Sequence, residues 1–270
     1  MELISMMAAP FAASVVLVLI HSYLGGHVLK RGVIFVDLAM AQFAAMGAAF
    51  GLLFGFELES VPAYFFGLAS ALAAAGLFAA ARRYIHKVPQ EAIIGIAYVA
   101  SSAAAILIAD RAPHGAEHIK QILVGSILWV SWTEVLKTML IYGALGLLLR
   151  WGHTRLVLVS EDPKKAREKG LNILGWDFFF YLIFAFVVTS SVRIAGVLLV
   201  FSILIVPSVF AALIGATGRS RLPMAWIFGI SMSLLGMLAS YFLDLPTGAT
   251  VVLVFGLGLV PATMLSGRKA

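Results

Sequence analysis

The chain has 270 residues, of which 62% are hydrophobic and only 12% are charged, and its mean hydropathy is +1.03. Soluble domains carry about 25% charged residues and about 45–50% apolar ones. A water-soluble fold of this size cannot cover so many apolar side chains. The composition therefore excludes a soluble globular protein, a disordered chain and a nucleic-acid-binding module, and it predicts a protein that lies in the lipid bilayer.

The net charge of +6 does not indicate a nucleic-acid partner, because of where the charges fall. Lysine and arginine lie in short clusters between long apolar segments, which is the distribution of an inner-membrane protein. The chain has no cysteine, so it forms no disulfide and no thiolate metal site.

A membrane-spanning helix needs about 20 mostly apolar residues. The sequence holds nine such segments: 7–24, 33–55, 61–81, 91–109, 133–150, 173–191, 194–214, 223–242 and 247–265. The first lacks the basic start of a signal peptide and is interpreted as a retained span. Segments 173–191 and 194–214 are so close that they can merge into one broken or re-entrant element. We expect an all-α, polytopic fold of eight or nine spans with short loops, forming one membrane domain over residues 1–270.

The orientation follows from the basic residues, which are enriched on the cytoplasmic side of membrane proteins. If the N-terminus lies outside, only four of the 19 lysine and arginine residues fall outside: Arg111, Lys120, Lys137 and Arg193. The sequence therefore predicts a multi-pass protein of the inner (plasma) membrane with its N-terminus outside and its C-terminus inside.

The longest inner loop carries a short, highly charged segment at residues 160–171. Glu161 or Asp162 can accept hydrogen bonds from the free N–H groups of a first helical turn. Pro163 suits the first helical position, and Gly170 suits a left-handed C-terminal cap. We expect a capped cytoplasmic helix at about 161–170. Two interpretations stay open, a solvated connector and a helix that docks onto a cytoplasmic partner.

Short motifs follow one another in a fixed order along the chain. They are Gly125-Ser126-Ile127-Leu128, Glu161-Asp162-Pro163, Ala166, Gly170-Leu171, Gly196-Val197-Leu198-Leu199-Val200, Pro207 and Asp244-Leu245-Pro246-Thr247-Gly248. This ordered set resembles the permeases of metal-cation ABC importers, and the resemblance runs from about residue 25 to residue 265.

The resemblance implies a function and a set of partners. Such permeases work as homodimers that import zinc, manganese or iron, with a separate solute-binding protein outside and a separate ATPase dimer inside. It also implies a coupling helix in the ATPase cleft, formed here by Glu161, Asp162, Pro163, Ala166 and Gly170. The sequence has no G-x-x-x-x-G-K-[ST] loop, so ATP hydrolysis must come from the partner. The chain is therefore expected to be a transport subunit, not an enzyme, with a transported metal but no permanently bound cofactor.

The second span holds two polar residues, Asp37 and Gln42, among many alanines and glycines. An ionisable residue inside a span is costly and is a functional candidate by default. Permeases of this kind usually carry an Asp and a His four residues apart here, facing the pathway. Aligning on Gly47 puts Gln42 at the histidine position and Leu38 at the aspartate position.

Asp37 and Gln42 are five residues apart, so they point about 140° apart on a helix and cannot bind one ion together. We expect both along the substrate pathway. Two alternatives to a pathway role for Asp37 stay open, namely that it reaches the interface or that it pairs with Arg31 or Lys30. The small residues of this span have two interpretations, close helix packing and the lining of a narrow conduit.

A candidate metal site lies in the outer segment after the fourth span. If Pro113 begins a helix, His114 and His118 share one face and Glu117 flanks them. Two imidazoles and a carboxylate suit zinc, manganese or ferrous iron, with zinc slightly favoured. The alternative is an amphipathic helix whose polar face meets water. The other histidines are interpreted as solvated interface residues: His21, His27, His86 and His153.

The leading hypothesis is thus a permease for a divalent metal ion, with zinc favoured and manganese or iron as alternatives. A polytopic membrane metalloenzyme that uses the outer His/Glu cluster is a second hypothesis, although no catalytic base or nucleophile accompanies the cluster. A secondary transporter working alone is a third. It would need carboxylates at mid-membrane, where only Asp37 comes close.

Overall fold

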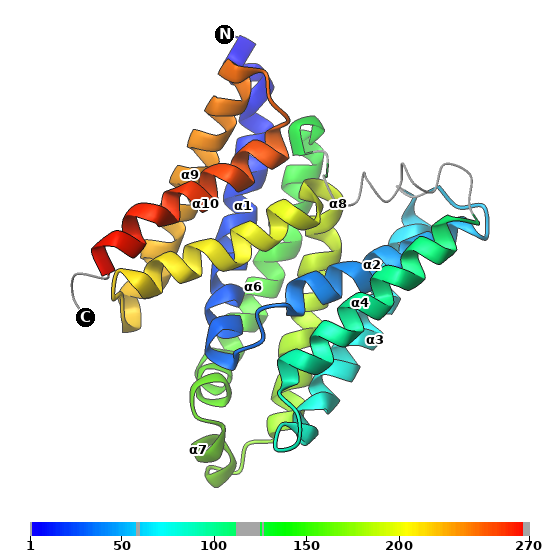
Figure 1. Ribbon diagram of the computed structural model, residues 1–270, viewed down its shortest axis with the longest axis vertical. Coiled ribbons are helices and arrows are strands. Elements are labelled where there is room, and N and C mark those ends of the chain that lie inside the picture. The colour runs from blue at the N-terminus through cyan, green and yellow to red at the C-terminus, as the bar shows by residue number, and fades with distance from the viewer. Residues whose placement is uncertain (1, 58–59, 112–124, 126, 267–270) are drawn as a thin grey trace. The chain divides into compact units, whose positions relative to one another are not determined.

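The computed structural model describes residues 2–57, 60–111, 125 and 127–266, and within them the chain forms helices and no strand (Figure 1). The α-helices are α1 (Glu2–Arg31), α2 (Val36–Leu52), α3 (Val61–Ala81), α4 (Gln90–Ala109), α6 (Trp132–Glu161), α7 (Pro163–Glu168), α8 (Ile173–Leu213), α9 (Arg221–Leu243) and α10 (Thr247–Ser266). Short 3-10 turns occupy Arg82–Tyr84, Ile127–Trp129 and Gly218–Ser220. The predicted all-α fold is confirmed.

Seven of the described helical segments are long and apolar enough to cross a membrane. They are Met6–Arg31, Val61–Tyr84, Gln90–Ala109, Trp132–Glu161, Ile173–Leu213, Gly218–Leu243 and Thr247–Met264. The apolar helix α2 is shorter, with 17 residues. Each of the nine predicted spans coincides with one of these helices or with part of one.

The predicted spans 173–191 and 194–214 are joined in α8, a segment of 41 residues. Gly196 interrupts this segment, since its φ of 76° and ψ of 162° are not helical. A residue with a side chain rarely adopts such a φ, so glycine is the residue that fits the break. The prediction that these two spans merge into a broken element is confirmed.

The helices group into two compact units. The first unit comprises Met1–Leu29, Val124–Gly146 and Ile194–Ala270, and so contains most of α1, the start of α6, the end of α8, and α9 and α10. The second unit comprises Lys30–Leu123 and Leu147–Arg193, and contains α2 to α4, the end of α6, α7 and the start of α8. The expectation of a single domain over residues 1–270 stays a prediction.

Within the second unit, α2 packs against α3 and α4 (Figure 1). The contact between α2 and α3 depends on glycine. A Cβ on Gly47 would lie 2.4 Å from the carbonyl oxygen of Phe66, and a Cβ on Gly67 would lie 2.8 Å from that of Ala44. Small residues let helices in membranes approach this closely. Helix packing, one of the two interpretations of the small residues in α2, is therefore confirmed for Gly47.

Within the first unit, α1 lies directly against the end of α8. A Cβ on Gly25 would lie 2.0 Å from the carbonyl oxygen of Leu204. Close by, the Ser208 hydroxyl donates a hydrogen bond of 3.1 Å to the carbonyl oxygen of Ser22. This backbone-to-backbone contact leaves no room for a methyl group.

We expect Gly25→Ala and Gly26→Ala to change stability in opposite directions. At Gly25 the new methyl group meets backbone, and overpacking of this kind costs about 1–3 kcal/mol. A Cβ on Gly26 meets nothing within 4 Å, so Gly26→Ala gains up to about 1 kcal/mol of helix propensity. Unfolding of the purified protein in detergent measures both changes, and shifts of the same sign would contradict the packing described here.

Candidate functional site

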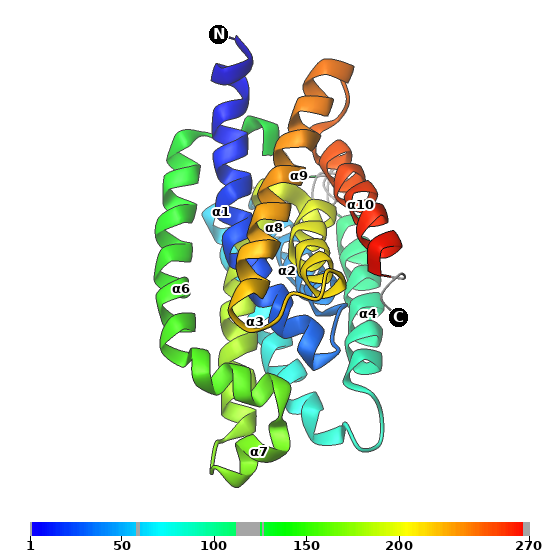
Figure 2. The ribbon, with the colours of Figure 1, turned by 90° about the vertical axis from the view of Figure 1, so that its left-hand side faces the viewer.

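The short helix α7 follows directly on the end of α6 (Figure 2). Asp162 separates the two helices, and its carboxylate accepts a hydrogen bond of 2.9 Å from the backbone N–H of Lys165. Pro163 is the first residue of α7. At the other end Gly170 has a φ of 75°, and its N–H donates to the carbonyl oxygen of Arg167 at 2.9 Å. Both predicted caps are confirmed.

The helix α7 has one buried residue, and most of its other residues are charged and exposed. Of its six residues, Ala166 is the one that is fully buried. The exposed residues of α7 are Lys164, Lys165, Arg167 and Glu168. Just before the helix, Glu161 forms an ion pair with Lys30 at the end of α1. The helix thus presents a charged surface while its start is held by neighbouring helices.

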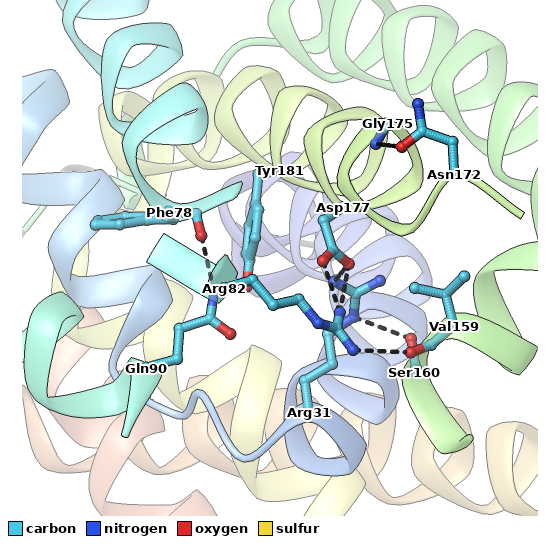
Figure 3. Close-up of polar contacts among 10 residues, drawn as sticks. All are labelled: Arg31, Phe78, Arg82, Gln90, Val159, Ser160, Asn172, Gly175, Asp177 and Tyr181. Carbon is cyan, nitrogen blue, oxygen red and sulfur yellow. Dashed lines mark hydrogen bonds and ion pairs between the residues drawn. The ribbon is translucent and has the colours of Figure 1, made fainter. Parts of the chain in front are cut away.

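Three helix ends meet at Asp177 near the start of α8 (Figure 3). The Asp177 carboxylate is fully buried and accepts a hydrogen bond of 2.6 Å from Nη1 of Arg31. Nη1 of Arg82 donates to both of its oxygens, at 2.6 and 2.7 Å. Arg31 is the last residue of α1, and Arg82 directly follows α3. One carboxylate therefore neutralises part of the charge of two guanidinium groups, as buried ions require.

Both arginines also hold the end of α6 (Figure 3). Nε of Arg31 donates to the Ser160 hydroxyl at 2.9 Å, and Nη2 of Arg82 donates to the carbonyl oxygen of Val159 at 3.2 Å. We call Arg31, Arg82, Ser160 and Asp177 the Asp177 cluster. It joins the end of α6, immediately before α7, to the ends of α1 and α3 and to the start of α8.

Asp177 is a site residue that was not predicted, although the sequence holds a signal for it. Asp177 is the one acidic residue between Glu168 and Asp244, and it lies inside a predicted span. A lone ionisable residue in a span is a functional candidate. The sequence does not reveal its partners, because Arg31 and Arg82 are 146 and 95 residues away along the chain.

Asp37 lies in the first turn of α2 and is fully buried. Neither of its carboxylate oxygens has a hydrogen-bond partner among the residues that the structure describes. Lys30 and Arg31 form ion pairs with other acids, so the alternative that Asp37 pairs with them is wrong. Gln42 is also buried, with 9% of its surface exposed. Each side chain stays a candidate for the substrate pathway.

The proposed outer metal site, His114, Glu117 and His118, lies outside the described residues. Within the described part of the chain, no three or more His, Asp or Glu side chains gather closely enough to hold a metal ion. The metal role of the three outer residues stays a prediction.

The structure places two of the remaining histidines differently from the interpretation of the sequence. His21 and His27 are buried, with 0% and 4% of their surfaces exposed, so the interpretation of solvated interface residues is wrong for both. The physical reason at His21 is local, because its Nδ1 hydrogen-bonds to the carbonyl oxygen of Leu17 one turn earlier at 2.8 Å. Its ring therefore has a polar partner without reaching water. The other two are exposed, as expected: His86 and His153.

The family assignment comes from comparison with known proteins. The model of a protein family described as the ABC 3 transport family matches residues 3–266. The chain belongs to the ABC 3 transport family. The resemblance of its ordered motifs to permeases of ABC importers is thereby confirmed.

Several curated relatives are membrane proteins of metal transport systems. The manganese transport system membrane protein MntC of Listeria monocytogenes is 26% identical over 241 residues, which cover 89% of this chain and 84% of the relative. A probable iron transport system membrane protein of Haemophilus influenzae is 24% identical, with coverage of 92% and 86%. The chelated iron transport system membrane protein YfeD of Yersinia pestis is 27% identical, with coverage of 68% and 61%.

Two solved structures share the fold. PsaBC from Streptococcus pneumoniae in complex with Fab aligns over 100% of this chain and 99% of that chain, with a TM-score of 0.79 and 20% identity. An inward-facing conformation of a metal-chelate type ABC transporter described as putative aligns over 97% and 85%, with a TM-score of 0.70 and 22% identity. At these identities the likeness establishes the fold alone.

Membership of the ABC 3 transport family confirms two further expectations. The chain is a membrane-spanning transport subunit and not an enzyme, because proteins of this family form the permease part of an ABC transport system. It is a multi-pass protein of the inner membrane, as its apolar helices also indicate.

Proposed function

We propose that the chain is the permease of an importer that moves a divalent metal ion, free or chelated, into the cell. The observation that carries the proposal is the family match over residues 3–266, together with relatives named for manganese, iron and chelated iron. The metal is the cargo, and no permanently bound cofactor is required. The permease works as a homodimer between an extracytoplasmic solute-binding protein and a cytoplasmic ATPase dimer.

In this proposal α7 is the coupling helix. Two observations support the role: caps at both ends fix the helix, and four of its six side chains are charged and exposed. A solvated connector needs neither, whereas a helix that enters a cleft on a partner must keep its shape. The N-terminus lies outside, so α7 faces the cytoplasm and the ATPase.

The cargo path runs past Asp37 and Gln42. Asp37 is the stronger candidate, since a buried carboxylate without a described hydrogen-bond partner has its full capacity to bind a cation. His114, Glu117 and His118 would meet the metal at the outer mouth. The histidines favour zinc, while the named relatives favour manganese or iron.

Reconstitution tests the function. The permease and its partner ATPase are placed in proteoliposomes with the solute-binding protein outside, and uptake of Mn²⁺, Fe²⁺ and Zn²⁺ is compared. We expect ATP-dependent uptake of at least one ion at least tenfold above the rate without ATP. Uptake that needs an ion gradient but no ATPase would instead support a secondary transporter, and no uptake of any ion or chelate would refute the proposal.

We expect Asp37→Asn to lower metal uptake at least tenfold while the protein stays folded. The amide has nearly the same shape but lacks the negative charge that attracts the cation. The matched control is Asp110→Asn at the exposed C-terminal cap of α4, which should leave uptake unchanged. Equal uptake by the Asp37→Asn variant and the wild type would remove Asp37 from the pathway. The double variant His114→Ala/His118→Ala tests the outer histidines in the same assay.

A further inference from the structure

We propose that the Asp177 cluster transmits movement of α7 to the ends of α1 and α3. This inference rests on the proposed function, because it assumes that the ATPase moves α7. It assigns Asp177, Arg31, Arg82 and Ser160 as positioning residues, which act on the cargo path through the helices and do not touch the metal.

A series of contacts leads from the residues before α7 to the membrane helices. Two consecutive residues at the end of α1, Lys30 and Arg31, hold two residues just before α7, Glu161 and Ser160. From the end of α3, Arg82 holds the next residue back, Val159, through its carbonyl oxygen. Three successive residues before α7 are therefore attached to two other helices.

Asp177 fixes the positions of both arginines. The side chain of Arg31 is only 3% exposed and that of Arg82 is 16% exposed, so their positions depend on the carboxylate between them (Figure 3). The Arg31 guanidinium also lies over the Phe180 ring, 4.2 Å from its centroid. Asp177 thus orients two forked donors toward the end of α6.

The lengths of these hydrogen bonds limit how far the end of α6 can move by itself. An N–H···O hydrogen bond has a donor–acceptor distance of about 2.7–3.2 Å, and a contact of about 3.6 Å is no longer one. The Arg31 side chain is only 3% exposed, so it cannot readily exchange a lost partner for water. The bonds from the arginines to Ser160 and Val159 are 2.9 and 3.2 Å long. A displacement of Val159 and Ser160 by more than about 1 Å must therefore either break these two hydrogen bonds or carry the ends of α1 and α3 along. Because the surrounding side chains are closely packed, we expect the ends of α1 and α3 to move with the end of α6.

The test has two measurements. The first is how firmly α7 is held in the purified full-length permease without the ATPase, and the second is how far transport is coupled to ATP hydrolysis in the complete permease–ATPase complex without a label. A nitroxide spin label is attached at Lys164→Cys, an exposed position of α7 in a chain without cysteine. Ser160→Ala removes the hydroxyl that Arg31 binds and leaves every charge in place. Asp177→Asn removes the shared carboxylate charge. Ser101→Ala is the matched control, because Ser101 is equally buried but donates within its own helix, to the carbonyl oxygen of Tyr98.

We expect the spin label to become more mobile, and metal transported per ATP hydrolysed to fall at least threefold, in Ser160→Ala and further in Asp177→Asn. Asp177→Glu should restore part of the coupling, and Ser101→Ala should change neither quantity. An unchanged label and an unchanged transport ratio in Ser160→Ala would overturn the inference even if Asp177→Asn does not fold. Absence of ATP-dependent uptake by the wild type would instead refute the proposed function, while the label would still report whether the cluster holds α7.

Discussion

Replacement of Glu161 and Asp162 together by lysine is expected to abolish stimulation of the ATPase and to lower metal uptake at least tenfold. Asp162 caps α7 through the Lys165 N–H, and loss of such a cap costs about 0.5–2 kcal/mol. Lysine at 161 also replaces the ion pair with Lys30 by repulsion. The helix therefore loses its fixed start at the surface that meets the ATPase.

The membrane-embedded part of the fold should survive this change, because Glu161 and Asp162 are exposed. Stimulation of ATP hydrolysis by the reconstituted permease measures the effect, and size-exclusion chromatography checks the fold. Asp110→Lys, a charge reversal at an exposed acid far from α7 in the sequence, is the control and should leave stimulation intact. Full stimulation by the Glu161→Lys/Asp162→Lys variant would show that α7 is only a connector.

The largest effect on stability is expected for Asp177→Ala, a loss of about 3–5 kcal/mol, which is typical when one partner of a buried ion pair is removed. The loss is large because the buried Arg31 guanidinium and the partly buried Arg82 guanidinium then keep their positive charges without a carboxylate. Unfolding in detergent measures it. Asp110→Ala, at an exposed site, should change stability by less than about 0.5 kcal/mol. A loss of less than about 1 kcal/mol for Asp177→Ala would mean that water reaches the two arginines.

The sequence predicted well whatever depends on neighbouring residues. Long apolar segments mark the spans because lipid requires them, and the caps of α7 follow from Asp162, Pro163 and Gly170 within one short segment. A break in α8 was also predictable, since only Val192 and Arg193 separate the predicted spans 173–191 and 194–214, although the break itself lies at Gly196.

What the sequence did not predict depends on residues that are distant in the chain. Asp177 meets Arg31 and Arg82 only because the ends of α1 and α3 lie close to the start of α8 in the second unit. His21 was expected at the interface because it lies in the last turn of the predicted span 7–24, but α1 continues to Arg31 and packing buries the ring. Hydropathy and spacing describe how each helix meets lipid, but they do not determine which face meets another helix.

The central claim is that α7 lies on the cytoplasmic side, where an ATPase can reach it, and thiol labelling tests this most directly. Lys164→Cys places a single exposed thiol on α7, and Glu57→Cys places one at an exposed position in a loop predicted to lie outside. A membrane-impermeant maleimide should label Cys at 164 in inside-out vesicles but not in intact cells, and Cys at 57 with the opposite pattern. Labelling of position 164 in intact cells would contradict the account.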